Sequence, residues 1–319
     1  MQLYYLCNTI NLDQTPKLNK TNTVGIMPFV ISRPAHFLPR IAYSIYLSVR
    51  NLGLNFYANY FLRSFAKKNM AHTGAVSENL QELYDNYYAP EIDTWREIGA
   101  IQKAENILDV VGKHRFGNLL EWGAGNGALL HKLAQTGIAS EFYAAEISES
   151  GIKQIEHRQI PMLKTAIVFD GYSLPYPDKF FDVVVLSHVL EHVEHQRMLL
   201  REIRRVAKNL IIEVPRDYKS GVDIKAQSLF DYGHINVYTP SLLRFLLKSE
   251  RFELVADKMS FSSDALLLFA AQARSKFLVK IRIKLYTLLR DFAYRISPYW
   301  RKETMINAYT IWCKTDSTN

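Results

Sequence analysis

The 319-residue sequence is poor in cysteine and contains no long apolar run. Only two cysteines are present, Cys7 and Cys313, which excludes a disulfide framework and a metal cluster held by several thiolates. Such cysteine usage indicates a reducing compartment, and we expect the cytoplasm. No stretch of about 18 apolar residues occurs, so a membrane-spanning helix is not expected. The opening residues, MQLYYLCNTI, lack a cationic region before an apolar stretch and would make a poor signal peptide.

Acidic residues are outnumbered by basic ones, and the excess of positive charge is unevenly distributed. The chain has 39 Lys and Arg against 31 Asp and Glu, a net charge of +8. Residues 77–259 carry −5, whereas residues 1–76 and 260–303 carry +7 and +6. A central region that is itself acidic is not expected to bind the phosphates of RNA or DNA. The overall composition, 48% hydrophobic and 22% charged, is that of an ordinary globular protein.

A glycine-rich stretch, LLEWGAGNGALL, occupies residues 119–130. NLLEW predicts a buried strand and ALLHKLAQTG predicts a helix, so the glycines join a strand to a helix. Glycine is favoured where the backbone needs a positive φ or where a ligand approaches closely. The next predicted strand, residues 141–147, brings Glu146 to about the twenty-residue interval at which nucleotide-binding βαβ units place an acid for a ribose hydroxyl.

Glu121 favours one of two cofactors that this turn could hold. Gly123, Gly125 and Ala128 also satisfy the dinucleotide fingerprint, so the glycines alone leave NAD open. A carboxylate two residues before the first glycine would repel a pyrophosphate but attract the sulfonium and amino group of S-adenosylmethionine (SAM). The tight G-x-G-x-G spacing that ends at Gly127 also favours SAM over NAD. We therefore expect SAM rather than NAD.

Strand and helix patterns alternate through the rest of the central region. Strands are predicted at residues 165–170, at the start of FFDVVVLSHVLEHV, at residues 209–215, and near residues 252 and 307. This alternation predicts a Rossmann-like α/β fold with a mostly parallel sheet of seven strands and helices on both faces. We expect a helical, basic and aromatic N-terminal extension at residues 1–76, followed by one domain at residues 77–319. A helical insertion at residues 261–303 would precede the last strand.

Four motifs in this order resemble the class I SAM-dependent methyltransferases, in particular a large bacterial group of methyltransferase domains. The motifs are LEWGAGNG, SLPYPDKFFDVV, HVLEHV and GHINVYTP, and the resemblance covers roughly residues 77–260 and the final strand. It implies SAM as cofactor, bound at the carboxyl ends of the parallel strands. The roles that it implies are Glu121 at the amino group, Gly123, Gly125 and Gly127 along the methionine moiety, Glu146 on the ribose, Asp170 and Gly171 at the adenine, and Ser187 and His188 beside the transferring methyl group.

Structural roles remain open for several of these residues. Glu121 could be an ordinary strand-end carboxylate, although such an acid needs a partner when buried. Glu146 could be a surface acid, and Asp170 could simply cap the turn before Tyr172. Thr239 is predicted to cap the helix that follows it, a structural role.

Histidines gather in SHVLEHVEH, where His188, Glu191, His192 and His195 are predicted to share one face at the start of a helix. His188 or His192 could act as a general base that Glu191 orients. The histidines could also be structural, or the group could bind a divalent metal. Related methyltransferases acting on quinone precursors or RNA ends show E-x-x-E-H here, and because His188 replaces the first acid we expect no metal. His234, in the loop DYGHINVYTP, is the third candidate catalytic residue because this loop should return over the cofactor crevice.

Both basic flanks combine cations with apolar and aromatic residues. In residues 275–296, SKFLVKIRIKLYTLLRDFAYRI, apolar residues recur at helical spacing while Lys276, Lys280 and Lys284 form another strip. Residues 37–69 have a similar composition. The flanks could together make peripheral contact with an anionic membrane, on its cytoplasmic face, or with a lipid-linked acceptor. Alternatively, they could pack as a lid over the acceptor.

The sequence therefore predicts an enzyme, a SAM-dependent methyltransferase whose acceptor is a small molecule. A hydroxyl of a sugar, of a glycolipid intermediate or of a similar metabolite is the favoured acceptor group. An RNA or protein methyltransferase is the first alternative; the acidic core and the absence of a tetrapeptide such as N-P-P-Y after the fourth strand count against it. A catalytically inactive SAM-binding module is the second alternative, against which the intact Glu121, Glu146 and Asp170 argue.

Overall fold

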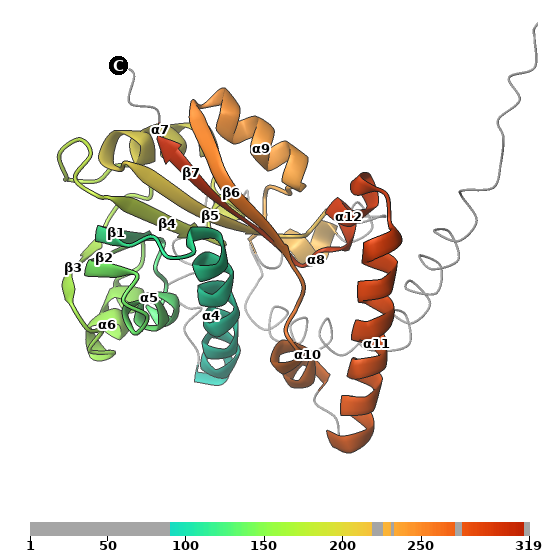
Figure 1. Ribbon diagram of the computed structural model, residues 1–319. Coiled ribbons are helices and arrows are strands. Elements are labelled where there is room, and N and C mark those ends of the chain that lie inside the picture. Colours follow the sequence, from blue (N-terminus) through green and yellow to red (C-terminus); the bar gives the residue numbers. More distant parts are fainter. Residues whose placement is uncertain (1–89, 219–225, 231–232, 272–275, 316–319) are drawn as a thin grey trace, which may run out of the picture. The chain divides into compact units, whose positions relative to one another are not determined.

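The computed structural model describes residues 90–218, 226–230, 233–271 and 276–315 (Figure 1). All of these belong to the second of two compact units, which comprises residues 38–319. The extension expected at residues 1–76, with its aromatic and basic residues, lies outside the described residues. Its predicted role therefore stays a prediction.

The centre of the described chain is a sheet of seven strands, as predicted. The order across the sheet is β3-β2-β1-β4-β5-β7-β6, with β1 to β5 paired in parallel and β7 antiparallel to both of its neighbours. The strands are β1 (Phe116–Trp122), β2 (Ala139–Glu146), β3 (Leu163–Val168), β4 (Val183–Ser187), β5 (Asn209–Pro215), β6 (Phe252–Ser260) and β7 (Ala308–Thr315). The third strand ends two residues earlier than predicted, so that Asp170 lies in the turn beyond it.

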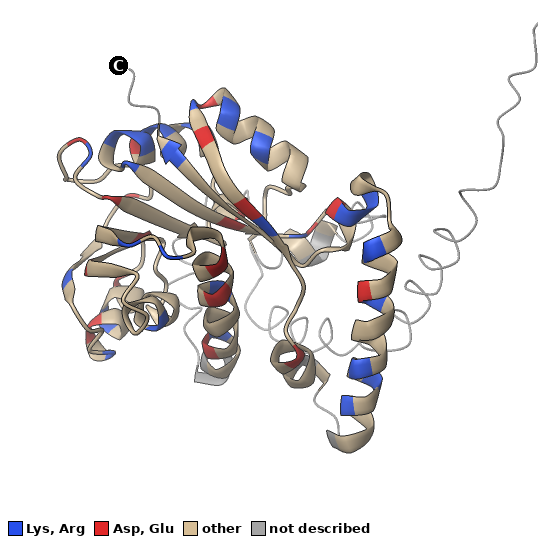
Figure 2. Cartoon of the chain, in the orientation of Figure 1, with Lys and Arg blue, Asp and Glu red and all other residues tan. Residues whose placement is uncertain are grey.

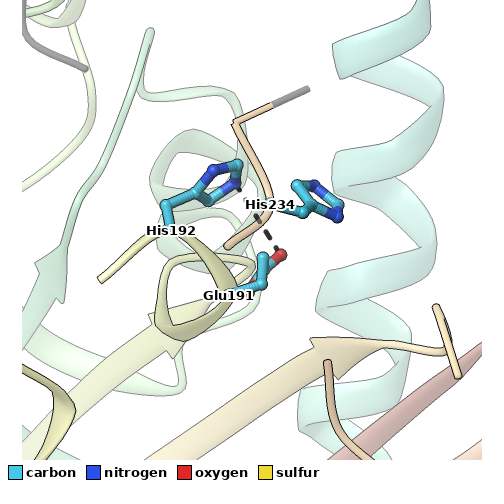
Figure 3. A group of neighbouring side chains, drawn as sticks. All are labelled: Glu191, His192 and His234. Atoms are coloured by element: carbon cyan, nitrogen blue, oxygen red, sulfur yellow. Dashed lines mark ion pairs between the residues drawn. The ribbon is translucent and has the colours of Figure 1, made fainter. Parts of the chain in front are cut away.

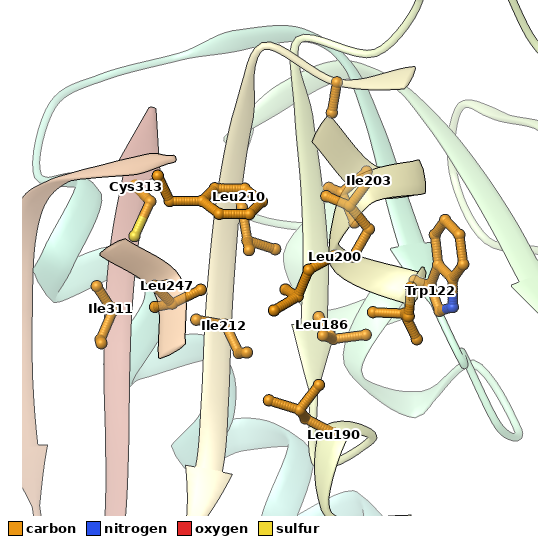
Figure 4. Packing of buried hydrophobic residues seen from close by; sticks show 14 of the residues in the cluster. Trp122, Leu186, Leu190, Leu200, Ile203, Leu210, Ile212, Leu247, Ile311 and Cys313 are labelled. Carbon is orange, nitrogen blue, oxygen red and sulfur yellow. The ribbon is translucent and has the colours of Figure 1, made fainter. Parts of the chain in front are cut away.

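Helices cover both faces of this sheet. One hydrophobic cluster joins the sheet to α4 (Pro90–Val111), α5 (Ala128–Ala134) and α6 (Glu149–His157), and the other joins it to α7 (Gln196–Val206) and α9 (Pro240–Ser249). Neighbouring strand residues alternate between the clusters: Leu119 packs in the first and Leu120 in the second. Figure 4 shows the second cluster around Trp122, Leu186 and Ile212. Since both faces are covered, the central strands β1, β4 and β5 are nearly continuous apolar runs, and an acid within one of them is exceptional.

Thr239 caps α9 as predicted, because its side chain accepts a hydrogen bond from the Leu242 N–H at 3.2 Å. The short helix α8 (Ala226–Phe230) precedes it in the chain.

Three helices stand between β6 and β7, in the stretch where an insertion was expected. They are α10 (Asp264–Ala271), α11 (Lys276–Ile296) and α12 (Tyr299–Met305). Near its C-terminal end, α11 contacts Phe261, which follows β6: the Arg290 guanidinium lies 4.1 Å from the Phe261 ring centroid, and the Tyr294 ring lies 5.0 Å from it. Helix α11 confirms the helix predicted within residues 275–296.

Among the described helices, none combines the length and the apolar content needed to cross a bilayer.

The residues after β4 do not form one helix, and this prediction was wrong. A short 3₁₀ helix, η2 (Leu190–His192), is followed by extended backbone at Val193, and α7 begins only at Gln196 with His195 as its N-cap. His188 has a positive φ of 56°, a conformation that an α-helix cannot contain. The four residues predicted to share a helical face, His188, Glu191, His192 and His195, therefore do not share one, and tertiary contacts decide which of them meet.

Candidate active site

The glycine turn connects β1 to α5 at the carboxyl edge of the sheet. Gly123 has a φ of +71°, and a Cβ placed on it would lie 2.6 Å from a methyl carbon of Val189, so neither the backbone nor the space admits a side chain. Gly125 also has a positive φ, and its N–H donates to Glu146 Oε2 at 2.8 Å. Gly127, again with positive φ, is the N-cap of α5. The turn is therefore fixed to the end of β2.

Glu121 is the penultimate residue of strand β1 and is 4% exposed. Its Oε2 atom has no hydrogen-bond partner in the described part of the chain. Burial raises the pKa of Glu121 to about 8, against the opposing influence of the Lys103 charge. A buried carboxyl oxygen that lacks a donor is rare in proteins, because leaving it unpaired costs about 1 to 3 kcal/mol. A ligand that brings a cationic group would relieve this deficit.

Glu146, the last residue of β2, is equally buried at 4% exposure. One carboxylate oxygen accepts the Gly125 N–H, and the other accepts the Ser148 N–H at 3.3 Å. Burial raises the pKa of Glu146, although these backbone hydrogen bonds oppose the shift. The surface-acid interpretation is thus excluded. The Ile147 N–H and the Ser148 hydroxyl also donate to this carboxylate, so a ligand hydroxyl that bonds to Glu146 would share it with the donors of the protein.

Asp170 is exposed and lies two residues beyond β3. Its Oδ1 atom accepts the N–H groups of Tyr172 at 2.8 Å and of Ser173 at 2.7 Å. It therefore caps the turn, as the structural alternative held, and Gly171 within this turn has a φ of +89°. The adenine contact implied for Asp170 and Gly171 stays a prediction, since one cap does not use up the acceptor capacity of a carboxylate.

Ser187 is the last residue of β4, the strand in the middle of the sheet, and His188 is the next residue in the chain. The Ser187 hydroxyl is buried at the end of β4 and has no hydrogen-bond partner among the described residues. The His188 backbone N–H donates to the Glu213 carbonyl at 2.9 Å, and its Nε2 lies 3.2 Å from Glu213 Oε1. These two bonds hold His188 in its unusual backbone conformation. Strained residues held in this way cluster at functional sites.

Glu213, in the middle of the apolar strand β5, is the residue that orients His188. It is 2% exposed, and its Oε2 accepts hydrogen bonds from Asn106 Nδ2 at 2.9 Å and from Thr310 Oγ1 at 2.6 Å. Burial favours the neutral acid, but the hydrogen bond and charge of His188 and the charge of Lys103 outweigh it and lower the pKa of Glu213. An ionised carboxylate can only accept, so His188 Nε2 carries the proton.

Sequence analysis did not single out Glu213, although the signal was present. It is an acid inside an otherwise apolar strand, NLIIEVP, and the argument applied to Glu121 applies to it equally. Its partners could not have been found in the same way, because Asn106 and Thr310 lie on α4 and β7, far away in the sequence.

Glu191, His192 and His234 form a second group beside His188 (Figure 3). Glu191 Oε1 lies 3.7 Å from His188 Nδ1 and 4.0 Å from His192 Nε2, and the rings of His192 and His234 lie 4.7 Å apart. The structure thus brings together the three predicted catalytic histidines around Glu191. His195 is not part of the group, because its residue caps α7 and is exposed.

Burial and neighbouring charges set the protonation of this group. Burial, together with the charge of His234, lowers the pKa of His192 to about 3. For His234 burial acts in the same direction, but the hydrogen bond to Asp217 and the charge of Glu191 outweigh it and raise the pKa. Burial raises the pKa of Glu191, and a proton on the neighbouring imidazoles of His188 and His234 would oppose this.

Comparison with known proteins identifies the domain that carries these residues. Residues 120–210, from the glycine turn through β5, match the family model described as methyltransferase domain. The chain therefore carries a methyltransferase domain, and S-adenosylmethionine is the cofactor that the resemblance of the sequence motifs implied.

Individual relatives of this methyltransferase domain match only in part. The ubiquinone/menaquinone biosynthesis C-methyltransferase UbiE of Burkholderia mallei (strain SAVP1) is 33% identical over 95 residues, which are 29% of this chain and 39% of that protein. The chain thus spans about two fifths of the length of this relative.

Two solved structures share the fold at low sequence identity. A chain from the complex between the Haloferax volcanii Trm112 methyltransferase activator and the putative methyltransferase has a TM-score of 0.54 at 14% identity, covering 73% of this chain and 97% of that one. Geranyl diphosphate C-methyltransferase from Streptomyces coelicolor A3(2), solved with Mg²⁺, geranyl diphosphate and S-adenosyl-L-homocysteine, has a TM-score of 0.51 at 12% identity, covering 77% and 100%. These likenesses establish the fold.

The residues at the carboxyl edge of the methyltransferase domain fit the cofactor. Glu121 and Ser187, on the adjacent strands β1 and β4, each present a buried oxygen that has no hydrogen-bond partner within the described ranges. Glu146 closes the neighbouring strand β2. A ligand with an amino group and a diol can pair with this set of oxygens.

Proposed function

We propose that the protein transfers a methyl group from SAM to a small-molecule acceptor, with a hydroxyl oxygen as the favoured acceptor atom. The observation that carries this proposal is the pair of buried carboxyls, Glu121 and Glu146, at the ends of adjacent strands around the glycine turn of a methyltransferase domain. Burying an acid in an apolar sheet edge is unfavourable unless it is paired; Glu146 is bonded to backbone donors, whereas Glu121 Oε2 has no hydrogen-bond partner among the described residues.

SAM supplies an electrophilic methyl group for an in-line displacement, and the residues of the chain bind, orient and accept a proton. Glu121 pairs with the amino group of the cofactor, while Glu146 accepts from the ribose hydroxyls and Asp170 and Gly171 flank the adenine. His188 is the general base: its Nε2–H donates to Glu213, which leaves Nδ1 unprotonated and able to accept the proton of an acceptor hydroxyl. The Glu213 carboxylate then stabilises the imidazolium, as an oriented acid does for a catalytic histidine.

A carbon atom of an aromatic or quinone-like ring is the second candidate acceptor. It is favoured by the name of the UbiE relatives, which are C-methyltransferases of ubiquinone/menaquinone biosynthesis. Transfer to such a carbon also releases a proton, so His188 would serve both chemistries. NMR of the methylated product distinguishes the two acceptor atoms, because an O-methyl and a C-methyl group differ in chemical shift.

We further propose that the acceptor is lipid-linked and that α11 contacts an anionic membrane on its cytoplasmic side. Five apolar residues along one side of α11 are at least half exposed: Leu278, Ile281, Leu285, Leu288 and Phe292. The opposite side, with Ile283, Arg290 and Ala293, is buried. The cations of α11 are drawn in Figure 2, and Lys280, Arg282, Lys284 and Arg295 are exposed. An exposed apolar stripe flanked by cations complements an anionic bilayer surface.

Cofactor binding provides the first test. Glu146→Gln keeps an oxygen that can accept the Gly125 N–H but removes an acceptor from the ribose hydroxyls. We expect SAM affinity to fall at least tenfold in isothermal calorimetry, because one or two ligand hydroxyls lose a charged acceptor. Glu149→Gln, an exposed acid on the following helix, is the matched control and should bind SAM as the wild type does. Equal affinities for all three proteins would contradict the assignment.

Label transfer tests the reaction itself. Methyl-labelled SAM is incubated with cell extract fractions and either the wild type or His188→Ala, and the labelled product is identified. We expect a small, solvent-extractable product that forms with the wild type and falls at least a hundredfold with the variant. Label that is removed by nuclease or protease would indicate an RNA or protein acceptor. SAM binding without any labelled product would support an inactive binding module.

A further inference from the structure

Glu191, His192 and His234 each present one ligand atom to a common point. The three atoms lie within 4.8 Å of one another, although Glu191 and His192 come from η2 and His234 from the loop after α8 (Figure 3). Atoms that bind one metal ion at about 2.0 to 2.2 Å can lie no farther apart than about twice that distance. A small adjustment of one side chain would therefore bring this group into coordination range.

Both histidines are oriented as metal ligands commonly are. His192 Nδ1 lies 3.0 Å from the Gly233 carbonyl oxygen, which can only accept, so the proton is on Nδ1 and the lone pair is on Nε2. His234 Nδ1 donates in the same way to Asp217 Oδ2 at 2.6 Å. A carbonyl or carboxylate bound to the other ring nitrogen is what fixes the tautomer of a metal-binding histidine and raises its basicity.

Glu191 supplies an independent observation that points to a cation. Its side chain is 1% exposed, and neither carboxylate oxygen has a hydrogen-bond partner among the described residues. The nearest histidine nitrogens, at 3.7 and 4.0 Å, are too distant for hydrogen bonds. A buried carboxyl group without any hydrogen bond is unfavourable, and a metal ion is one of the partners that such groups take in proteins.

We propose that Glu191, His192 and His234 bind a divalent transition-metal ion, with zinc as the representative. Two imidazoles and one carboxylate are a ligand set that suits Zn²⁺, whereas Mg²⁺ prefers oxygen atoms. Three protein ligands leave a coordination position open, as in catalytic rather than structural zinc sites. The expectation of no metal rested on His188, which stands in the place of the first acid of E-x-x-E-H; the third residue that the structure places beside Glu191 and His192 is instead His234, from the GHINVY loop.

The position of this ion would give it a role at the acceptor. Glu191 lies 3.7 Å from His188, the proposed base, so an acceptor oxygen bound to the open metal position would lie next to the group that takes its proton. Coordination to zinc lowers the pKa of a bound hydroxyl or water. This role rests on the proposed function, whereas the binding of the ion does not.

Metal binding is measured on the full-length protein without a histidine tag, after treatment with EDTA and dialysis. ZnCl₂ is titrated by isothermal calorimetry, with MgCl₂ in parallel, and bound zinc is counted by mass spectrometry after gel filtration. We expect one zinc ion per chain, no measurable magnesium binding, and at least a hundredfold weaker zinc binding in Glu191→Gln and His234→Gln. Asp217→Ala, which removes only the partner of His234, should weaken binding about 10- to 100-fold. His195→Gln is the matched control, since this neighbouring histidine lies outside the group.

Two further readouts keep the proposal testable if a variant folds poorly. Substitution by Co²⁺ should give the wild type a visible absorption spectrum that changes in Glu191→Gln, and SAM affinity measured on the same preparations should stay unchanged. Loss of zinc binding with intact SAM binding supports the site independently of the proposed reaction. A wild type that retains no zinc, or that binds zinc as weakly as Glu191→Gln does, overturns the proposal even where SAM binding holds.

Discussion

At the scale of single residues, buried acids organise the carboxyl edge of the sheet. Four acids there are less than 5% exposed: Glu121, Glu146, Glu191 and Glu213. They differ in their hydrogen bonds to neighbouring residues. Glu146 and Glu213 are bonded to donors, whereas Glu121 and Glu191 keep oxygens without partners. The bonded pair therefore builds the site, and the unpaired oxygens are available to ligands.

Glu121 makes the stability of the cofactor-free protein depend on pH. Its pKa is 4.5 in an unfolded chain, and burial raises it to about 8 in the folded protein. Between these values the folded state holds a proton that the unfolded state has lost. The free energy of unfolding therefore falls as the pH rises through this window, by up to about 1.4 kcal/mol per pH unit.

Glu121→Gln, which cannot titrate, should remove this dependence. We expect the variant to match the wild type near pH 4.5 and to exceed its stability by on the order of 3 kcal/mol at pH 8. Urea unfolding followed by circular dichroism at several pH values measures the difference. Glu149→Gln, at an exposed position, should follow the wild type throughout. Parallel pH profiles for wild type and Glu121→Gln would show that Glu121 is ionised in the folded protein without a ligand.

At the scale of secondary structure, α11 is a helix with two different faces. Its buried face holds it to Phe261, and its exposed face carries the apolar stripe from Leu278 to Phe292. Five exposed apolar side chains along one side of a helix exceed the scattered exposure that is normal on a protein surface. We therefore infer that this apolar stripe is covered by another surface.

Sedimentation with liposomes tests the membrane as that surface. We expect the full-length protein to bind vesicles that contain phosphatidylglycerol, to stay free of neutral phosphatidylcholine vesicles, and to lose binding as salt rises. Because each cation near the surface contributes about 1 kcal/mol, reversing Lys280 and Lys284 to Glu should weaken binding at least tenfold. Replacing Leu285 and Leu288 by Ser should do the same by removing apolar contact.

The matched control for this experiment lies on α9, where Leu242 and Phe245 are likewise exposed. Their replacement by Ser should leave vesicle binding unchanged. If the wild type remains in the supernatant at low salt with anionic vesicles, α11 is not a membrane surface. The lid interpretation and a soluble acceptor would then be favoured.

At the scale of the whole molecule, one polar cluster ties distant parts of the chain together. Asn106 on α4 and Thr310 on β7 both donate to Glu213 on β5, and Asn106 also donates to Ser260 on β6 at 3.1 Å. The last two strands and the first described helix are thus joined behind His188. The insertion between β6 and β7 adds surface without interrupting this connection.

Thr310→Val removes one donor from the buried Glu213 carboxylate while keeping the side-chain volume. We expect the free energy of unfolding to fall by about 1 to 3 kcal/mol, because a buried acceptor loses a hydrogen bond. Thr310→Ser keeps the hydroxyl and should be less than half as destabilising. Urea unfolding of the three proteins measures this order; equal stability of the Val variant and the wild type would mean that water replaces the lost donor.

Much of the fold could be predicted from the sequence, because the patterns that define it are local. Residues 209–215 and 252–260 are apolar or alternating runs and form β5 and β6 within the predicted bounds. Glycines at 123, 125 and 127 mark the turn because positive φ is a property of single residues. Glu121 stood out because an acid in an apolar strand is exceptional wherever the strand lies.

Only the tertiary structure decided how the polar residues of the site combine. The positive φ of His188 breaks the helical spacing assumed for SHVLEHVEH, and it is held by Glu213, a residue on another strand. His234 meets Glu191 and His192 because its loop folds back, with Ile235 and Asn236 donating to the Glu191 carbonyl. Sequence periodicity reports which side of an element a residue occupies, whereas contacts between elements depend on how the chain closes. Some residues of the site could therefore be predicted from the sequence, whereas the contacts between them could not.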